Sequence, residues 1–458
     1  MDPPARASPP RRRRVPIAAR IAWWTAWVGL ACGVAAAIAV GLLPLHAKRM
    51  LERAAARVEQ VAGPLEPTWR RPNLTPEDNA SARLIAAARA VRLDDAEREL
   101  IRTIGREGDP REIADRRGEL APLVERNRGA IDSLLSTSGL ANDFGVDPFD
   151  PEAELPAALG AEQFTVAQLA VVDAHLSTAE GDPGRSERVA AVLGEQATRY
   201  GEVPTQLHQM LSRGYQSYQL RLVHHLARAC EEPACPERLR DALPPNRSRD
   251  AFRRTVAGET ELMLRRHAKT SAELRGYLDL PDRLVLAWFD YSIAGTFDQW
   301  LKLLAGWDLD PREMEAVLAF EPGPIAELDT FRSLFAPDWT LPGRLRSTSE
   351  ARDLAELALT LRAEALGGVP CDRAWTDALA AWTFAELSPA EVAVEQHDDR
   401  SCTLRRAGAD YIVAEIFGGT SRAPPFDWPV PPPTPPAPAH PLACPRAEGW
   451  LSGRKQRS

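Results

Sequence analysis

The stretch PTQLHQMLSRGYQSYQLRLVHHLARA, residues 204–229, carries the pattern that decides the fold. Its apolar residues recur every three or four positions: Leu207, Leu211, Tyr215, Tyr218, Leu222 and Leu226. This spacing places the six side chains on one face of an α-helix, whereas a strand would need every second residue to be apolar. The stretch therefore predicts a long amphipathic helix with one face in the core.

The same periodicity recurs on both sides of this stretch, in segments separated by short turns rich in Gly, Pro and Asp. Thr75-Pro76-Glu77-Asp78 is expected to start the first helix, with Thr75 as its N-cap. Further helices are expected at residues 161–180, 185–200, 250–266, 283–304, 313–320, 325–335 and 350–366. Since no strand pattern or regular 34-residue repeat separates them, residues 75–366 predict a mainly α domain, an irregular array of antiparallel helical hairpins.

Residues 284–304 are apolar enough to suggest a membrane-spanning helix. They contain Asp290, Asp298 and Lys302, however, and each such charge would cost about 3 kcal/mol at the centre of a bilayer. This segment is therefore expected to be a buried core helix.

The pattern changes after Gly367, and residues 367–421 are expected to form a small α+β element. Residues 372–386 predict one more helix. Three segments of strand length follow, at residues 391–396, 402–406 and 410–416. They predict a three-stranded antiparallel meander packed on the helix. Residues 422–458 are rich in Pro and poor in apolar residues, and they predict a disordered, extended tail.

An uncharged apolar run, residues 21–45, lies near the start of the chain. At about 1.5 Å per residue, a helix of this length can cross a hydrocarbon core of about 30 Å. Arg11 to Arg14 precede the run, and this dense positive charge predicts that residues 1–20 stay in the cytoplasm. Residues 46–74 would be a stalk and linker, and the main domain would lie outside the bacterial inner membrane, in the periplasm.

Two other interpretations of the amino end are open. A cleaved signal peptide would account for the apolar run, although the run is longer than the usual apolar region of about 7–15 residues. The arginine cluster would also fit twin-arginine export, but it is equally expected of any cytoplasmic flank. The sequence favours the uncleaved anchor with one crossing.

The net charge of the chain indicates which class of partner it can bind. The formal net charge is −8, and the first twenty residues are strongly basic, so the rest of the chain is more acidic than this value. Nucleic-acid binding needs a basic surface that neutralises phosphate. The composition therefore argues against a nucleic-acid partner.

Cysteine usage fits an oxidising compartment. Cys230 and Cys235 flank a Pro-containing turn, and Cys371 and Cys402 are the next pair along the chain. Two disulfides, Cys230–Cys235 and Cys371–Cys402, are predicted, with Cys444 left over. Free thiols are an alternative, and so is a metal site at the first pair, although no second ligand pair follows at metal spacing.

No sequence motif indicates a catalytic site, a cofactor site or a metal site. Walker, dinucleotide-binding, zinc-protease and nucleophile-elbow patterns are absent from the sequence. His224 and His225 are adjacent in a helix and therefore point in different directions. The acidic stretch with Asp143, Asp147, Asp150, Glu152 and Glu154 offers oxygen ligands for calcium, but it lacks EF-hand spacing and is expected to be a solvated loop.

Three segments carry a resemblance to a family. They are Asn79-Ala-Ser-Ala-Arg-Leu84, residues 169–182, and Asp410-Tyr-Ile-Val-Ala-Glu-Ile-Phe-Gly418. In these segments the chain resembles a loose group of uncharacterised bacterial single-pass membrane proteins. The resemblance implies an amino-terminal anchor, a helical extracytoplasmic domain and a small β element. It implies no activity and no site residues.

Two functions follow as expectations. The first is a membrane-anchored extracytoplasmic helical scaffold that binds a protein partner without catalysis. The alternative is a membrane-tethered extracytoplasmic enzyme, a hydrolase whose site is not visible in the sequence. A deep pocket with two close carboxylates, or with a His beside a Ser or Cys, would favour the enzyme.

Overall fold

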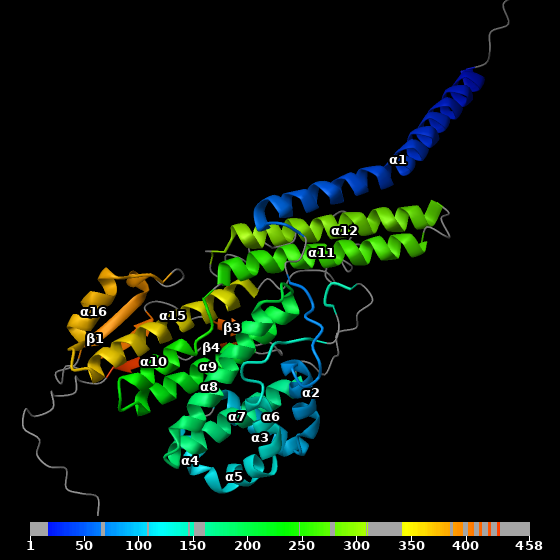
Figure 1. The fold of residues 1–458 in the computed structure, drawn as a ribbon. Helices are drawn as coiled ribbons and strands as arrows, with labels where there is room; N and C mark the ends of the chain where they lie inside the picture. Colours follow the sequence, from blue (N-terminus) through cyan, green and yellow to red (C-terminus); the bar gives the residue numbers. More distant parts are fainter. Residues whose placement is uncertain are drawn as a thin grey trace, which may run out of the picture.

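The computed structural model describes residues 17–65, 69–107, 110–144, 147–150, 161–246, 248–274, 280–307, 309, 341–384, 388–396, 402–406, 412–414, 420–422 and 428–430. At some of these positions, residues 17–22, 35–37 and 39–40 among them, no side-chain burial is described. Helices dominate the described chain, and the strands are short and lie near its carboxy end (Figure 1). The predicted mainly α class is confirmed.

A helical body forms the lower part of the molecule in Figure 1. Its helices are α2 (Ala80–Ala90), α3 (Asp95–Glu107), α4 (Pro110–Asp115), α5 (Arg117–Arg126), α6 (Arg128–Leu135), α7 (Ala161–Ala179), α8 (Pro183–Gly201), α9 (Gln206–Ala229) and α10 (Ala234–Asp241). Helices α7, α8 and α9 pack against one another, and α2 to α6 pack around α7. The helices expected at residues 161–180, 185–200 and 204–229 are confirmed within a few residues.

Helix α2 begins later than the sequence predicts. The expected cap, Thr75, instead donates a hydrogen bond to the Asp78 carboxylate at 3.0 Å. Asn79 caps the helix, and its Nδ2 donates to the carbonyl oxygen of Asp143 at 2.6 Å. The start of α2 is therefore fixed by a contact with a residue far along the chain.

A second layer of helices lies above this body. Its members are α1 (Ile17–Ala62), α11 (Ser248–Leu274), α12 (Leu280–Ala305) and the start of α15 (Leu341–Leu366). They share a second hydrophobic core that includes Val58, Phe252, Phe297 and Trp300. The prediction of a core helix at residues 284–304 is therefore confirmed. The helices expected at residues 313–320 and 325–335 lie outside the described residues.

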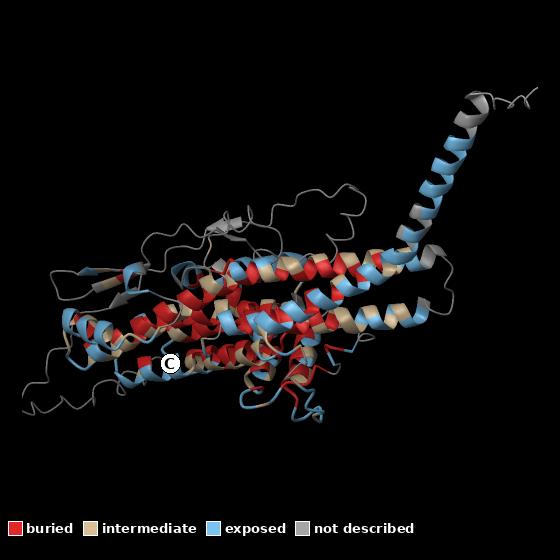
Figure 2. Cartoon of the chain, turned by 90° about the horizontal axis from the view of Figure 1, so that it is seen from above, coloured by how far each residue is buried: buried red, intermediate tan, exposed pale blue. Residues whose placement is uncertain are grey.

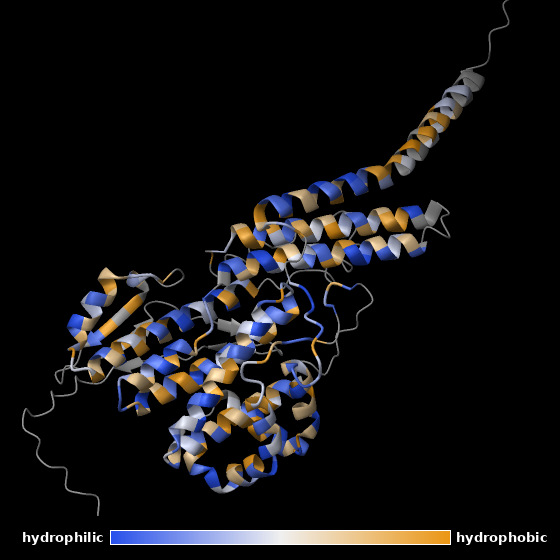
Figure 3. Ribbon diagram, in the orientation of Figure 1, coloured by the Kyte–Doolittle hydropathy of each residue, from blue (hydrophilic) through white to orange (hydrophobic). Residues whose placement is uncertain are grey.

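Helix α1 changes its surroundings near Pro44, which lies inside the helix. The ribbon of α1 bends part of the way along its length (Figure 1). Before Pro44 the helix leaves the body (Figures 2 and 3), and the large apolar side chains described there, Trp23 and Leu42 among them, are exposed. After it, Ala47 and Ala54 are fully buried against the body. Residues 46–62 continue the helix as predicted, but they are part of the core rather than a free stalk, because small side chains let α12 pack closely on α1.

The predicted membrane-spanning helix at residues 21–45 is not identified. Within the part of the chain that the structure describes, no helix is both long enough and apolar enough to span a membrane.

The carboxy-terminal element differs from the predicted meander. Helix α16 (Cys371–Ala380) is followed by the antiparallel strands β1 (Val392–Gln396) and β2 (Cys402–Arg406). The third strand of this sheet is β5 (Trp428–Val430), which pairs with β2, whereas β3 (Ile412–Ala414) pairs with β4 (Thr420–Arg422) as a separate ribbon.

The strand β5 also corrects the boundary of the predicted tail. Its middle residue, Pro429, lacks an N–H group, but a Pro is tolerated at the edge of a sheet. The residue before a Pro favours extended backbone, which suits Trp428 for a strand. The tail expected at residues 422–458 therefore contains a strand, and residues 431–458 lie outside the described residues.

Candidate functional site

A groove of about 630 Å³ lies between α1, α11 and α12, and Pro44 is its first lining residue on α1. Its walls are formed by residues 44–59, 264–271 and 283–290, together with Leu65. This volume falls within the range of about 300–1,000 Å³ that is typical of small-molecule sites. The groove is therefore the candidate functional site.

Three polar residues meet where α11 and α12 form neighbouring walls of the groove. His267 and Ser271 are four positions apart on α11 and share one face of the helix, and Asp290 faces them from α12. The Nε2 atom of His267 lies 2.6 Å from Oδ1 of Asp290 and 3.4 Å from Oγ of Ser271. The His267 and Asp290 side chains are only 15% and 12% exposed. Asp290 is one of the charges that make a membrane crossing by residues 284–304 unfavourable. In the structure its carboxylate is paired with His267.

A Ser, a His and an Asp in contact invite comparison with a hydrolase triad. In such a triad, one imidazole nitrogen donates to the carboxylate and the other accepts the proton of the serine. Here the carboxylate and the hydroxyl both face the same nitrogen, Nε2 of His267. When Nε2 donates to Asp290 it has no lone pair left to accept the Ser271 proton. The arrangement is therefore a polar clamp between two helices rather than an activated nucleophile.

Among the described residues, some of the charged side chains around the groove have ion-pair partners and others do not. Lys48 lies 3.9 Å from Glu52 on the same helix, and both side chains are well exposed. Asp290 is paired with His267. Arg283 is exposed and has no ion pair among the residues that the structure describes. Arg283 is therefore the cationic side chain of the described lining that is available to an anionic ligand.

A second, smaller cavity of about 70 Å³ lies between α8, α9, α11 and α15. On its wall, Nε of the buried Arg213 donates to Oγ1 of Thr348 at 3.0 Å and to the Arg344 carbonyl at 3.2 Å. Nearby on α15, burial raises the pKa of Asp353. The space suits a few water molecules rather than a larger ligand, so this cluster joins α9 to α15.

The buried His208 is also part of the structure rather than of a site. Burial lowers its pKa to about 4. Its Nδ1 lies 2.6 Å from Oγ1 of Thr205, and its ring packs against Phe144 with 4.7 Å between the ring centres. The neighbouring Tyr200 and Tyr215 rings are stacked in the same core. His208 is therefore neutral at pH 7 and enclosed by aromatic groups.

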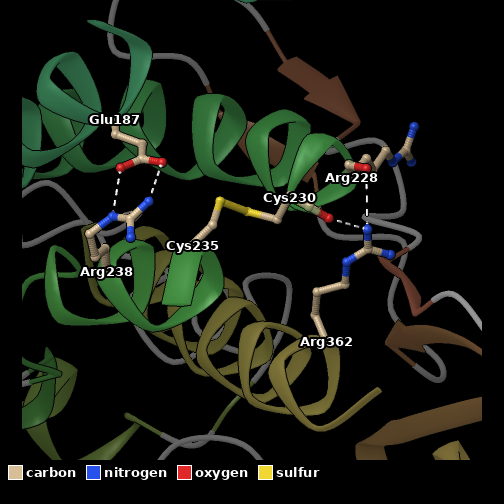
Figure 4. Close-up of a disulfide and its surroundings, with 6 residues drawn as sticks. All are labelled: Glu187, Arg228, Cys230, Cys235, Arg238 and Arg362. Atoms are coloured by element: carbon tan, nitrogen blue, oxygen red, sulfur yellow. Dashed lines mark hydrogen bonds and ion pairs between the residues drawn. A yellow bond between two sulfur atoms is a disulfide. The ribbon is translucent and has the colours of Figure 1, made fainter. Parts of the chain in front are cut away.

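The predicted disulfide between Cys230 and Cys235 is present and links the end of α9 to the start of α10 (Figure 4). The Arg362 guanidinium on α15 donates to the Cys230 carbonyl at 2.5 Å. Cys371 is also disulfide-bonded. Its partner is not among the described side chains, so the pairing with Cys402 stays a prediction, and Cys444 lies outside the described residues.

The other candidate ligands from the sequence are held by internal contacts. Asp143 is buried and accepts from Nε of Arg71 at 2.7 Å, and Oδ1 of Asp147 accepts from the N–H of Phe149. Glu152 and Glu154 lie outside the described residues. Asp150 is described, and no group of three metal-type ligands occurs among the residues searched.

The two adjacent histidines diverge, as the sequence predicts. The His225 ring packs against His175, whereas Nε2 of His224 lies 3.3 Å from the Arg228 guanidinium.

The sequence alone did not predict the groove, because its α1 wall lies about 200 residues before its α11 and α12 walls along the chain. The spacing of four residues between His267 and Ser271 was the local sequence signal that places both side chains on one helix face. It indicates a polar cluster only once Asp290 is known to lie opposite them. No family model, curated protein or solved structure matches the chain. The resemblance to bacterial single-pass membrane proteins therefore stays a prediction.

Proposed function

We propose that the chain is a membrane-anchored extracytoplasmic helical scaffold that binds a partner at the membrane surface without catalysis. One observation carries the proposal, namely the change of environment along α1. The large apolar side chains described before Pro44 are exposed on a helix that leaves the body, whereas Ala47, Ala54 and Val58 are fully buried. A series of exposed apolar side chains on a projecting helix is what a bilayer would cover.

The orientation of the anchor follows from charge and from the cysteines. The arginines before the run favour a cytoplasmic amino end. The Cys230–Cys235 disulfide supports an oxidising compartment for the body. We therefore place the main domain in the periplasm of a bacterial cell.

Binding is favoured over catalysis by the geometry of the groove. The competing hydrolase would use Ser271 as nucleophile and His267 as base, but Nε2 of His267 faces both Ser271 and Asp290. A protein partner is proposed because the body is a helical array that offers long helix faces, and because the acidic composition disfavours nucleic acid.

The test of the anchor uses the full chain expressed in a bacterial host. The double variant Val34→Arg/Ile38→Arg puts two charges into the apolar run and should release the protein from carbonate-washed membranes. The control Val61→Arg/Leu207→Arg changes two similarly exposed apolar residues outside the run and should stay in the membrane pellet. A reporter fused after Ser458 that is active only after export should be active. Wild-type protein in the carbonate supernatant, or an inactive exported reporter, would reject the proposal.

A further inference from the structure

We infer that the groove between α1, α11 and α12 binds one phospholipid of the surrounding membrane, with an acyl chain along the groove and the phosphate beside Arg283. The inference rests on the proposed membrane anchor and names a ligand for the site. Three features support it, namely the position of the groove, the chemistry of its walls and the charge at one end.

The position of the groove brings it to the membrane surface. Pro44 and Leu45 line it and are also the last residues of the apolar run. From there the groove follows α1 to Ala56 and Glu59, which are exposed on the part of α1 that packs on the body. If residues 21–45 cross the bilayer, one end of the groove lies at the level of the lipid headgroups, where a lipid can enter from the side.

The walls of the groove suit a hydrocarbon chain. Leu51, Leu264, Leu286 and Ala287 contribute apolar surface from all three helices. The half-buried His267 and the buried Asp290 pair with each other at 2.6 Å and do not need a polar ligand. The transfer of each methylene group of an acyl chain from water into such a groove lowers the free energy.

Arg283 lies eight residues before Tyr291 on α12, and the Tyr291 ring lies beside His46 of α1. The charge at this end of the groove suits a phosphate. Arg283 is exposed and has no ion pair among the described residues, and a guanidinium can bind two phosphate oxygens at once. Lys48 lies on the facing wall and has only a long, exposed contact with Glu52. The acidic Glu59 lines the groove more than two helical turns further along α1. A phospholipid therefore matches both the apolar walls and the charged end.

The experiment uses the full chain in nanodiscs that contain phosphatidylglycerol with a photoreactive diazirine on one acyl chain. After illumination, peptide mapping should find labels in residues 264–271 and 283–290, in addition to labels in residues 21–45. Labels confined to residues 21–45 would overturn the inference while the anchor stands. Loss of all labels, with release of the protein by carbonate, would overturn the anchor itself.

A groove-filling variant separates binding from chance contact with the bilayer. Ala268 is exposed and lines the groove, so Ala268→Trp should fill it without a clash in the core. The label in residues 283–290 should fall at least fivefold, with unchanged label in residues 21–45. The matched control Thr270→Trp adds the same ring at an exposed position of α11 that does not line the groove, and its labelling should equal that of the wild type. Equal labelling of Ala268→Trp and wild type would overturn the inference.

The headgroup part of the inference has its own test. Arg283→Gln should lower the groove label from the phospholipid about threefold or more, whereas Arg253→Gln, an exposed arginine elsewhere on α11, should leave it unchanged. A diazirine fatty acid without a phosphate should label the groove less than the phospholipid does. Stronger labelling by the fatty acid, or no effect of Arg283→Gln, would reject the phosphate contact.

Discussion

His267 on α11 and Asp290 on α12 meet through a contact of 2.6 Å between Nε2 and Oδ1, and both side chains are largely withdrawn from water. The pair joins two antiparallel helices beside a groove whose other walls are mainly apolar. A buried carboxylate is costly unless it is paired and hydrogen-bonded. The pair therefore links α11 to α12 beside the groove and compensates for the burial of the Asp290 carboxylate.

We expect Asp290→Ala to destabilise the protein by about 1–3 kcal/mol, because it leaves the His267 ring without its acceptor. Asp290→Asn keeps an oxygen acceptor and should cost less. Thermal unfolding followed by circular dichroism measures the difference. The control Asp298→Ala removes an exposed ion pair with Arg57 on the same helix and should cost less than about 1 kcal/mol. Equal effects of Asp290→Ala and Asp298→Ala would contradict the structural role of the His267–Asp290 pair.

His208 predicts a defined dependence of stability on pH. Burial lowers the pKa of His208 from 6.5 to about 4 in the folded state. Between these values the unfolded chain binds a proton at this ring and the folded chain does not, so the free energy of unfolding falls as the pH falls from 6.5 towards 4. The full loss from this group is about 3 kcal/mol.

The measurement compares unfolding in urea at pH 7 and at pH 4.5. In His208→Gln the loss of stability between the two pH values should be smaller than in the wild type by about 2 kcal/mol or more. His224→Gln, at a half-buried position of the same helix, serves as the matched control and should retain the wild-type loss. An unchanged loss in His208→Gln would show that this ring does not carry the effect.

Asp173 is the second buried carboxylate for which a strong effect is expected. One oxygen lies 2.7 Å from Nη1 of Arg128 and the other 2.6 Å from Nε of Arg185. Asp173→Ala should cost about 3 kcal/mol, because it leaves two arginines without their shared partner. Asp132→Ala removes a well-exposed contact of Arg185 and should cost less than about 1 kcal/mol. Similar shifts of the urea midpoint in both variants would count against a central role for Asp173.

The local pattern of the sequence predicted most of the helices but not how far each apolar face is buried. In α9 the expected apolar face is borne out by Leu211, Tyr215 and Leu222, which are buried. Leu207, at the start of the same pattern, is 42% exposed. The helical period fixes the direction of a side chain, whereas its burial depends on which other segment packs there.

The groove and the last strand could not be predicted, for the same physical reason. The groove exists because residues after Pro44 pack on α11 and α12, which lie more than 200 residues further along the chain. The strand containing Pro429 was hidden in a Pro-rich region that has few apolar residues, and only its pairing with β2 defines it. Both features depend on contacts between residues far apart in the sequence, and the local spacing of apolar residues does not indicate such contacts.

The disulfide between Cys230 and Cys235 closes a short loop at the junction of α9 and α10. The loop-entropy model gives about 2 kcal/mol for a loop of this length. The variant Cys230→Ala/Cys235→Ala should therefore unfold at a lower temperature than the wild type under non-reducing conditions. The contact of Arg362 with the Cys230 carbonyl should also loosen, since the loop that holds this carbonyl gains freedom.

Reducing agent should lower the unfolding temperature of the wild type but have a smaller effect on the double variant, in which the disulfide involving Cys371 is still present. The control is Cys32→Ala, because Cys32 is an exposed free thiol on α1 and its loss should leave the unfolding temperature unchanged. Peptide mapping without reduction gives an independent readout, and it should find Cys230 and Cys235 in one cross-linked peptide. Two alkylated thiols at these positions, in protein taken from the periplasm, would show that the bond does not form. A double variant as stable as the wild type would show that the bond does not stabilise the α9–α10 junction.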